Sequence, residues 1–305
     1  PKDQVSIKFG SNGEVKVYSL SGPSGQGHET VFADIVAEAL GIASDAIEVR
    51  AGDPDGPQDF AATGTIGSRS MMHHGSAMLN GANEVVRKGM DLAARDLEVA
   101  SADLDYRNGE YRVKGTDRAV KLLDLARKYA SGGATPLDTI GEMAMHRAFP
   151  SGAHVAEVEI DPDTGVVEVL SYVGVDDCGR IINHTLLEGQ MHGGILQGAG
   201  QVFGEHCVYD RATGQLMTGS FMDYFMPRAG LVPDIALYDH PVPSPNNPLG
   251  VKGAGEAGTT GALPTLMNAI LDALRPAGVG HLDMPATPSR VWNSLQDARQ
   301  PARTN

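Results

Sequence analysis

The sequence predicts an α+β protein made of two mixed α/β lobes, residues 1–145 and 146–305. Three observations support this fold class. Apolar and polar residues alternate in strand fashion around short turns in both halves. Apolar residues also recur at three- and four-residue spacing in both halves, as they do on one face of a helix. Glycine-rich loops stand between these segments, and 38 glycines are many for 305 residues.

The composition describes an ordinary globular protein and excludes several function classes. Hydrophobic residues make up 41% and charged residues 20% of the chain. The net charge of −14 argues against a general nucleic-acid or anionic-membrane binder, because neutralising phosphates requires clustered Lys and Arg. Two cysteines imply no disulfide framework. No apolar run reaches the roughly 20 residues of a membrane-spanning helix, and the first residues do not form a signal peptide, so we expect a cytoplasmic protein.

The first lobe opens with a predicted β-hairpin, residues 5–9 and 15–19, whose turn contains Ser-Asn-Gly. A glycine-rich loop follows at residues 21–30, and helical spacing then continues to Gly41, where a helix can end. A strand, a glycine-rich loop and a helix in this order can bind phosphate through backbone N–H groups. The loop is not a Walker A loop, because no Gly-Lys-Ser/Thr follows, and it lacks the second histidine of a zinc-protease motif.

A second glycine-rich segment, Gly64–Ser70, opens a long predicted helix over residues 71–100. Arg69 is suited to bind phosphate, and an arginine at a helix start is unfavourable unless an anion is present. An exposed arginine without a ligand is the alternative. His73 and His74 suggest a metal site, but adjacent residues on a helix point to different faces, which favours surface or core packing.

Residues 101–148 are predicted to hold a small β segment and a short helix. The second lobe begins with two predicted hairpins, within residues 154–175 and 207–221. Between them lies a helical segment, residues 187–200, whose five glycines are costly in a helix and predict close approach to another backbone or to a cofactor. Cys178 precedes this helix, and a buried core residue is a more common role for a lone cysteine than a redox thiol or a metal ligand.

The loop Pro245–Gly261 carries the clearest functional signal. Glu256 lies in its middle, between Gly255 and Ala257, whose small size leaves the carboxylate facing a ligand. A helix follows to about residue 274, with its N-terminal N–H groups directed at the loop, and a polar tail ends the chain. The segment is therefore interpreted as an active-site loop with an acid/base, although spacing alone fits a solvated loop carboxylate equally well. Its Gly-x-Gly-x-x-Gly pattern is discounted as a dinucleotide motif, because no buried strand precedes it.

Five motifs in a fixed order give the chain a resemblance to a known family: Gly25–Thr30, Gly64–Ser70, Val175–Gly179, Glu188–Gly194 and Gly250–Glu256. Together they resemble the C-terminal half of the molybdenum-binding large subunit in the xanthine dehydrogenase / aldehyde oxidase / aerobic carbon monoxide dehydrogenase family, the molybdenum hydroxylases. Each motif alone is weak. Their order along nearly the whole chain makes the resemblance specific.

The resemblance implies a molybdopterin cofactor, in bacteria usually the cytosine dinucleotide, with molybdenum held through the pterin dithiolene and not by a side chain. Glu256 corresponds to the family's general base, which deprotonates a molybdenum-bound hydroxide as it attacks an electrophilic carbon, while hydride passes to a sulfido ligand. The implied pterin and dinucleotide contacts are Gln26, Gly27, His28, Gly67, Ser68, Arg69 and Ser70. Further implied cofactor contacts are Asp177, Cys178, Gly179, Gln190, Lys252, Gly253 and Gly255.

The family subunit is more than twice as long as this chain, so the resemblance implies either a large subunit split into two chains or a fragment. The chain alone is then expected to be inactive. Implied partners are the N-terminal half of the large subunit as a separate chain, an iron–sulfur subunit and a flavin (FAD) subunit, because two cysteines cannot ligate a cluster that needs four. The expected reaction is oxidative hydroxylation of a small N-heteroaromatic or aldehyde-type substrate with water as the oxygen source. A non-catalytic cofactor- or nucleotide-binding scaffold subunit is the alternative.

Overall fold

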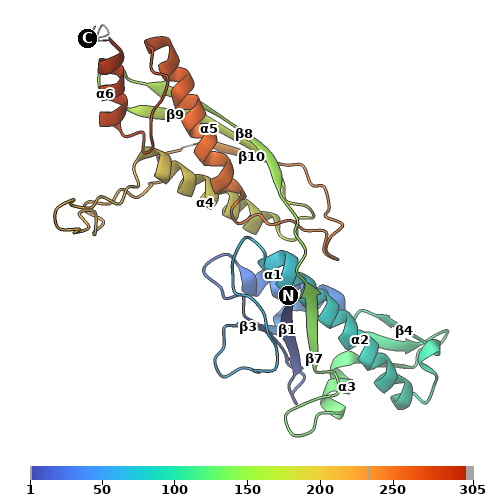
Figure 1. The fold of residues 1–305 in the computed structure, drawn as a ribbon. Helices are drawn as coiled ribbons and strands as arrows, with labels where there is room; N and C mark the ends of the chain where they lie inside the picture. The colour runs from blue at the N-terminus through green and yellow to red at the C-terminus, as the bar shows by residue number, and fades with distance from the viewer. Residues whose placement is uncertain (1, 233, 300–305) are drawn as a thin grey trace. The chain divides into compact units, whose positions relative to one another are not determined.

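The computed structural model describes residues 2–232 and 234–299, drawn as a ribbon in Figure 1. The chain folds into two compact units. The first consists of Pro1–Phe149, Gly179–Asn183 and Pro243–Gly253, and the second of Pro150–Cys178, His184–Val242 and Ala254–Asn305. Both units combine helices with strands, so the predicted α+β class is confirmed. The outer ends of the predicted lobes, residues 1 and 305, lie outside the described residues.

The first unit is built on a four-stranded sheet in the order β3-β2-β1-β7. Its strands are β1 (Lys2–Phe9), β2 (Val15–Ser19), β3 (Ile47–Ala51) and β7 (Thr139–Ala144). β2 and β7 run antiparallel to β1, whereas β3 runs parallel to β2. The predicted hairpin of β1 and β2 is confirmed. The sequence pattern does not predict β7. This strand pairs with β1, which lies far from it in the sequence, so no tight turn joins the two strands.

Two helices, α1 (His28–Leu40) and α2 (Ser76–Asp96), pack on this sheet and against each other (Figure 1). Their apolar faces are buried, including Phe32 and Val36 of α1 and Met78 and Val85 of α2. α1 ends at Gly41 as predicted, with a left-handed φ of 60°. The predicted helix over residues 71–100 begins at Met71 as predicted, with a π-helical first turn, Met71–Gly75, but α2 ends at Asp96, before the predicted residue 100.

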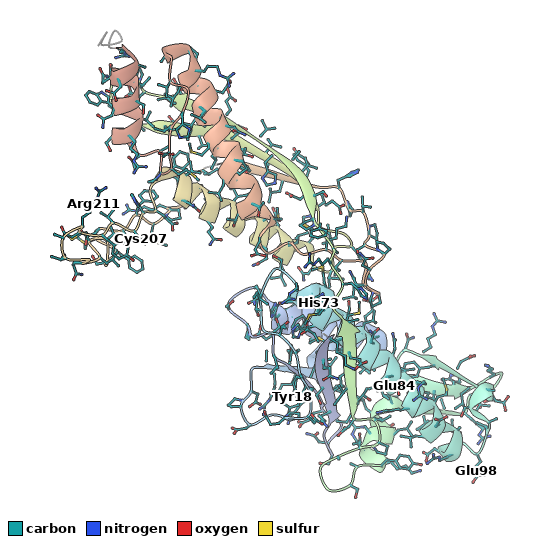
Figure 2. The ribbon with its side chains drawn as sticks, in the orientation of Figure 1. Tyr18, His73, Glu84, Glu98, Cys207 and Arg211 are labelled. Carbon is teal, nitrogen blue, oxygen red and sulfur yellow. The ribbon has the colours of Figure 1, made fainter. Side chains whose placement is uncertain are left out.

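The end of α2 is set by a backbone motif that the sequence does not signal. The Val99 N–H donates to Ala94 O, and the Glu98 N–H donates to Arg95 O. Glu98, labelled in Figure 2, has a left-handed φ of 52°. This is a Schellman motif, whose left-handed position usually holds glycine. Glutamate takes that position here, so no glycine marks the helix end.

A small antiparallel sheet completes the first unit, in the order β4-β5-β6. Its strands are β4 (Leu104–Arg107), β5 (Glu110–Val113) and β6 (Ala119–Lys121), and α3 (Leu122–Lys128) follows. The β segment and the short helix predicted for residues 101–148 are thereby confirmed. Tyr111 donates its hydroxyl to Val86 O of α2 at 3.0 Å, and Gly89 leaves room for its ring. This contact attaches the small sheet to α2.

The second unit has a three-stranded sheet in the order β10-β9-β8. β8 (Ser151–Ile160) and β9 (Val167–Asp177) form the first predicted hairpin of the second half, and β10 (Ile235–Asp239) joins β9 in parallel. Three helices share a core with this sheet: α4 (His184–Phe203), α5 (Ala257–Leu274) and α6 (Pro288–Arg299). α6 corrects the predicted polar tail, because Val291 and Leu295 are buried in that core.

The second predicted hairpin, within residues 207–221, is reduced to a turn with one isolated bridge between Tyr209 and Leu216. No neighbouring strand is present to extend the pairing in the described chain. Phe221 at the end of this segment and Met222 just after it are 85% and 93% exposed. Cys207 and Arg211 mark the segment in Figure 2. Across residues 2–232 and 234–299, no helix is both long enough and apolar enough to cross a membrane.

Candidate functional site

The two glycine-rich loops that precede α1 and the π-helix are joined by hydroxyl groups within the first unit. The Ser21 hydroxyl lies 3.0 Å from the Thr65 hydroxyl and 2.6 Å from the Ser70 hydroxyl. Thr65 donates in turn to Gly22 O at 3.0 Å. Two motifs far apart in the sequence, including the predicted contact residue Ser70, therefore lie side by side.

Gln26 and Gly27 shape the loop before α1. The Gln26 side chain turns back on its own loop: Nε2 donates to Gly22 O at 3.1 Å, and Oε1 accepts from the Ser24 N–H at 2.5 Å. Gly27 caps α1 with a left-handed φ of 75°, a conformation that glycine adopts without strain. The amide of Gln26 is thus engaged within the loop, and the Thr30 and Val31 N–H groups in the first turn of α1 both donate to Gly27 O at 3.2 Å.

His28 is buried at the first position of α1. Its Nδ1 lies 3.2 Å from Ser21 O, and its ring stacks on Phe32 with a centroid separation of 4.6 Å. Burial lowers the pKa of His28, so the ring is neutral at neutral pH. The imidazole therefore supports the loop and adds no positive charge to the N-terminus of α1.

Gly67, Ser68 and Arg69 form the turn that leads into the π-helix. Gly67 and Ser68 both have left-handed backbones, with φ of 60° and 55°, and this conformation is strained for serine. The half-buried Arg69 donates from Nε to Ile66 O at 3.2 Å, and its Nη1 lies 3.7 Å from the Met145 sulfur. In the part of the chain that the structure describes, Arg69 forms no ion pair with a carboxylate. Such a guanidinium suits an anion.

Two segments from the second half of the sequence complete this part of the first unit. Gly253 packs on the turn just described, where a Cβ would lie 2.5 Å from Ser68 O. Gly179 forms a bridge with Val251, and a Cβ at Gly179 would lie 2.5 Å from Gly250 O. The structure therefore brings together the predicted residues Gly67–Ser70, Gly179 and Lys252–Gly253.

The remaining predicted cofactor contacts belong to the second unit. Asp177 and Cys178 are buried where β9 ends, and Asp177 Oδ1 accepts from the Val242 N–H at 2.9 Å. Gln190 is half-buried on α4. Gly255 and Glu256 are exposed, and Glu256 is the N-cap residue of α5. The helix predicted to follow Glu256 is confirmed.

Glycines hold the start of α5 against α4. A Cβ at Gly258 would lie 2.6 Å from Met191 O, and one at Gly194 would lie 3.0 Å from Thr259 N. The Thr259 hydroxyl donates to Gly194 O at 2.9 Å. The prediction of close approach to another backbone is confirmed, and the crossing fixes the helix end that carries Glu256.

Two buried polar clusters are missed by sequence reasoning. In the second unit, His154 lies 2.7 Å from the Tyr172 hydroxyl through Nδ1 and 2.9 Å from Asp176 Oδ2 through Nε2. In the first unit, Asp3 contacts His73. The available signal is weak: His154 and Asp3 occupy inward positions of alternating strands, where apolar residues are expected.

Among residues 2–232 and 234–299, no three His, Cys, Asp or Glu side chains are grouped as they would be around a metal ion. The described groups suited to a ligand are backbone N–H groups, hydroxyls and the Arg69 cation. These groups lie on motifs that carry the family resemblance.

The chain belongs to the molybdopterin cofactor-binding domain family, whose model matches residues 1–233, and to the large subunits of the molybdenum hydroxylases. It is 38% identical to the carbon monoxide dehydrogenase large chain of Hydrogenophaga pseudoflava, over 97% of this chain and 37% of that one. It is 36% identical to the nicotine 6-hydroxylase large subunit of Paenarthrobacter nicotinovorans, over 95% of this chain and 36% of that one.

A solved structure gives the same result. The fold is similar to that of quinoline 2-oxidoreductase from Pseudomonas putida 86, with a TM-score of 0.85 and 31% identity over 98% of this chain and 38% of that one. The chain thus spans little more than a third of the length of these relatives.

Proposed function

We propose that this chain is the molybdopterin-binding part of a molybdenum-dependent hydroxylase, an oxidoreductase that works only with partner chains. The proposal rests on the backbone contacts that bring Gly67–Ser70, Gly179 and Lys252–Gly253 together in the first unit. These residues come from three separate motifs, and packing between glycine backbones holds them together.

The residues of the first unit fit a cofactor that carries phosphate. Arg69 supplies a half-buried cation without an acidic partner in the described chain, and the left-handed turn at Ser68 is the kind of strain found at ligand sites. No heavy atom lies within 4 Å of a Cβ placed at Gly25, so that loop leaves space beside its backbone. We infer that the cofactor is the cytosine dinucleotide form, bound by Gly67, Ser68, Arg69, Ser70, Gly179, Lys252 and Gly253, and by Gln26, Gly27 and His28 through their backbone.

The second unit contributes the proposed base and further contacts. We assign Asp177, Cys178, Gln190 and Gly255 to cofactor binding, with no protein side chain on the metal. When bound, the molybdenum centre would supply the two-electron oxidation, with water as the oxygen source. Glu256, exposed at the start of α5, would accept a proton on a carboxylate oxygen from the water-derived nucleophile.

The substrate class that the relatives favour is an N-heteroaromatic compound. Nicotine 6-hydroxylase and quinoline 2-oxidoreductase act, by their names, on such rings, and both match nearly the whole of this chain. The carbon monoxide dehydrogenase large chain is a match of similar extent, so we infer that parts of the enzyme outside the matched region select the substrate. We propose as partners the N-terminal half of the large subunit, an iron–sulfur subunit and a flavin subunit, in the cytoplasm.

A Glu256→Gln variant of the complex purified from its source tests the proposal. We expect molybdenum near one per copy and a cytidine nucleotide in both wild type and variant, while turnover of the variant falls about 10²- to 10⁴-fold. Glu159→Gln, an exposed glutamate on β8, is the matched control and should retain full turnover.

Two results would count against the proposal. Unchanged turnover in Glu256→Gln would remove Glu256 from the chemistry. A wild-type complex that folds normally without molybdenum or a nucleotide would instead favour a non-catalytic scaffold subunit.

A further inference from the structure

Asp3 carries a carboxylate in the interior of the first unit. It lies on β1 and is 0% exposed. Its Oδ1 accepts from the Thr63 N–H at 2.5 Å and from the Thr63 hydroxyl at 2.9 Å, and its Oδ2 lies 3.1 Å from His73 Nδ1. A buried carboxylate is costly unless it is paired and hydrogen-bonded, and these three contacts meet that condition.

His73, labelled in Figure 2, is 2% exposed and has an acceptor on each side of its ring. Nδ1 faces Asp3 Oδ2, and Nε2 lies 3.0 Å from His146 O. A carboxylate and a carbonyl oxygen can only accept, so the His73 ring is held between two acceptors, one on β1 and one at His146.

The neighbouring His74 holds the same segment as a neutral ring. Its Nε2 donates to Thr63 O at 2.9 Å, and its Nδ1 lies 2.9 Å from the Ser19 hydroxyl, which can donate. Burial lowers the pKa of His74, in agreement with a neutral ring. Thr63 is therefore fixed at its N–H by Asp3 and at its carbonyl by His74.

We propose that Asp3 is a positioning residue for the Gly67–Ser70 turn, which it holds through its buried contacts with His73 and with Thr63. Thr63 precedes the turn and His73 follows it, so one carboxylate fixes both ends of the segment. Fixing both ends of the turn restricts its conformations before a ligand binds. The turn then loses less conformational entropy on binding, which favours binding. This inference rests on the proposed cofactor role of Gly67–Ser70.

An Asp3→Asn variant, matched in shape, removes the charge of the carboxylate that contacts His73. The matched control is Asp138→Asn. Asp138 Oδ1 accepts from the Phe9 N–H and from the Thr135 hydroxyl, both at 3.1 Å, so it anchors a loop at the other end of β1. In the purified complex we expect Asp3→Asn to weaken retention of molybdenum and cytidine nucleotide about 10- to 100-fold, as loss of a supporting contact does at metal sites. Asp138→Asn should retain both.

Nitrogen NMR of the full chain with labelled histidine gives a readout that does not depend on cofactor. The ring nitrogen signals of His73 are assigned by their loss in His73→Gln. We expect these signals to differ between wild type and Asp3→Asn, because Nδ1 then faces an amide in place of a carboxylate. If Asp3→Asn fails to fold, Thr63→Val removes a single hydroxyl contact without a change of charge and should weaken cofactor retention to a smaller extent.

The results separate this inference from the proposed function. Identical His73 ring nitrogen signals in wild type and Asp3→Asn, or equal retention by Asp3→Asn and Asp138→Asn, would overturn the positioning role alone. A wild-type complex without molybdenum would refute the proposed function, and the positioning role with it.

Discussion

Replacing Gly198 with alanine tests the crossing of α4 and α5. A Cβ at Gly198 would lie 2.8 Å from Ala262 Cβ and 3.2 Å from Thr259 O. Carbon atoms in contact prefer a separation of about 3.5–4.0 Å, so the helices must move apart by about 1 Å. Overpacking of this kind costs about 1–3 kcal/mol, and alanine recovers about 1 kcal/mol of helix propensity over glycine. The variant should therefore range from nearly neutral to destabilised by about 2 kcal/mol.

Gly193→Ala is the control on the same helix, because no heavy atom lies within 4 Å of its added Cβ. Gly193→Ala gains the helix propensity of alanine without the clash. The unfolding equilibrium constants of the two variants should therefore differ by about 5- to 150-fold, and this ratio measures the packing cost at Gly198. Urea unfolding followed by the fluorescence of Trp292 measures this. Trp292 is the only tryptophan in the sequence and lies on α6 of the second unit. Equal stabilisation by both substitutions would show that Gly198 does not pack on α5 as described.

Further predictions concern the first unit. Arg69→Met should reduce retention of the cytidine nucleotide and molybdenum by about 10-fold or more, since a charge-assisted hydrogen bond contributes about 1.5–3 kcal/mol. Arg87→Met, at an exposed arginine, should leave retention unchanged. Equal losses in the two variants would argue against Arg69 as an anion ligand. Burial lowers the pKa of His28 and His74, so the unfolded chain binds protons that the folded unit does not. Their contribution to stability is full above the usual histidine pKa of about 6.5 and is lost as the pH falls through and below it. Hydrogen exchange of β1 and β2, corrected for intrinsic rates, should therefore show weaker protection at pH 5 than at pH 7. His74→Gln should reduce that difference, and an unaltered difference would exclude His74 as a cause.

The elements that the sequence predicts each carry a local signal. β1–β2 and β8–β9 alternate around tight turns, and α1 ends at a glycine. β7 and β10 carry no such signal, because β7 pairs with the distant β1, and β10 joins β9 in parallel only after α4 and a long connection. α2 ends at a left-handed glutamate where glycine is usual. Local patterns therefore predict hairpins and helices, whereas the strands that complete both sheets depend on tertiary pairing.

The candidate site shows the same division. The glycine-rich motifs and Arg69 can be found in the sequence, but the packing of Gly253 on Ser68 exists only in the folded chain. Gln26 and His28 belong to a recognisable motif, yet their side chains serve their own loop. Asp3 resembles any acidic residue near a chain start, and only its contacts with Thr63 and His73 explain its burial.

The bridge between Gly179 and Val251 has a consequence for synthesis of the chain. The first unit contains residues up to Gly253, so its strands and helices emerge from the ribosome long before the last segments that pack on them. The Ser68 turn stays uncovered until then, while the intervening residues of the second unit are being made. A ligand that contacts both Ser68 and Gly253, as proposed above for the cofactor, can be loaded only after translation has passed residue 253.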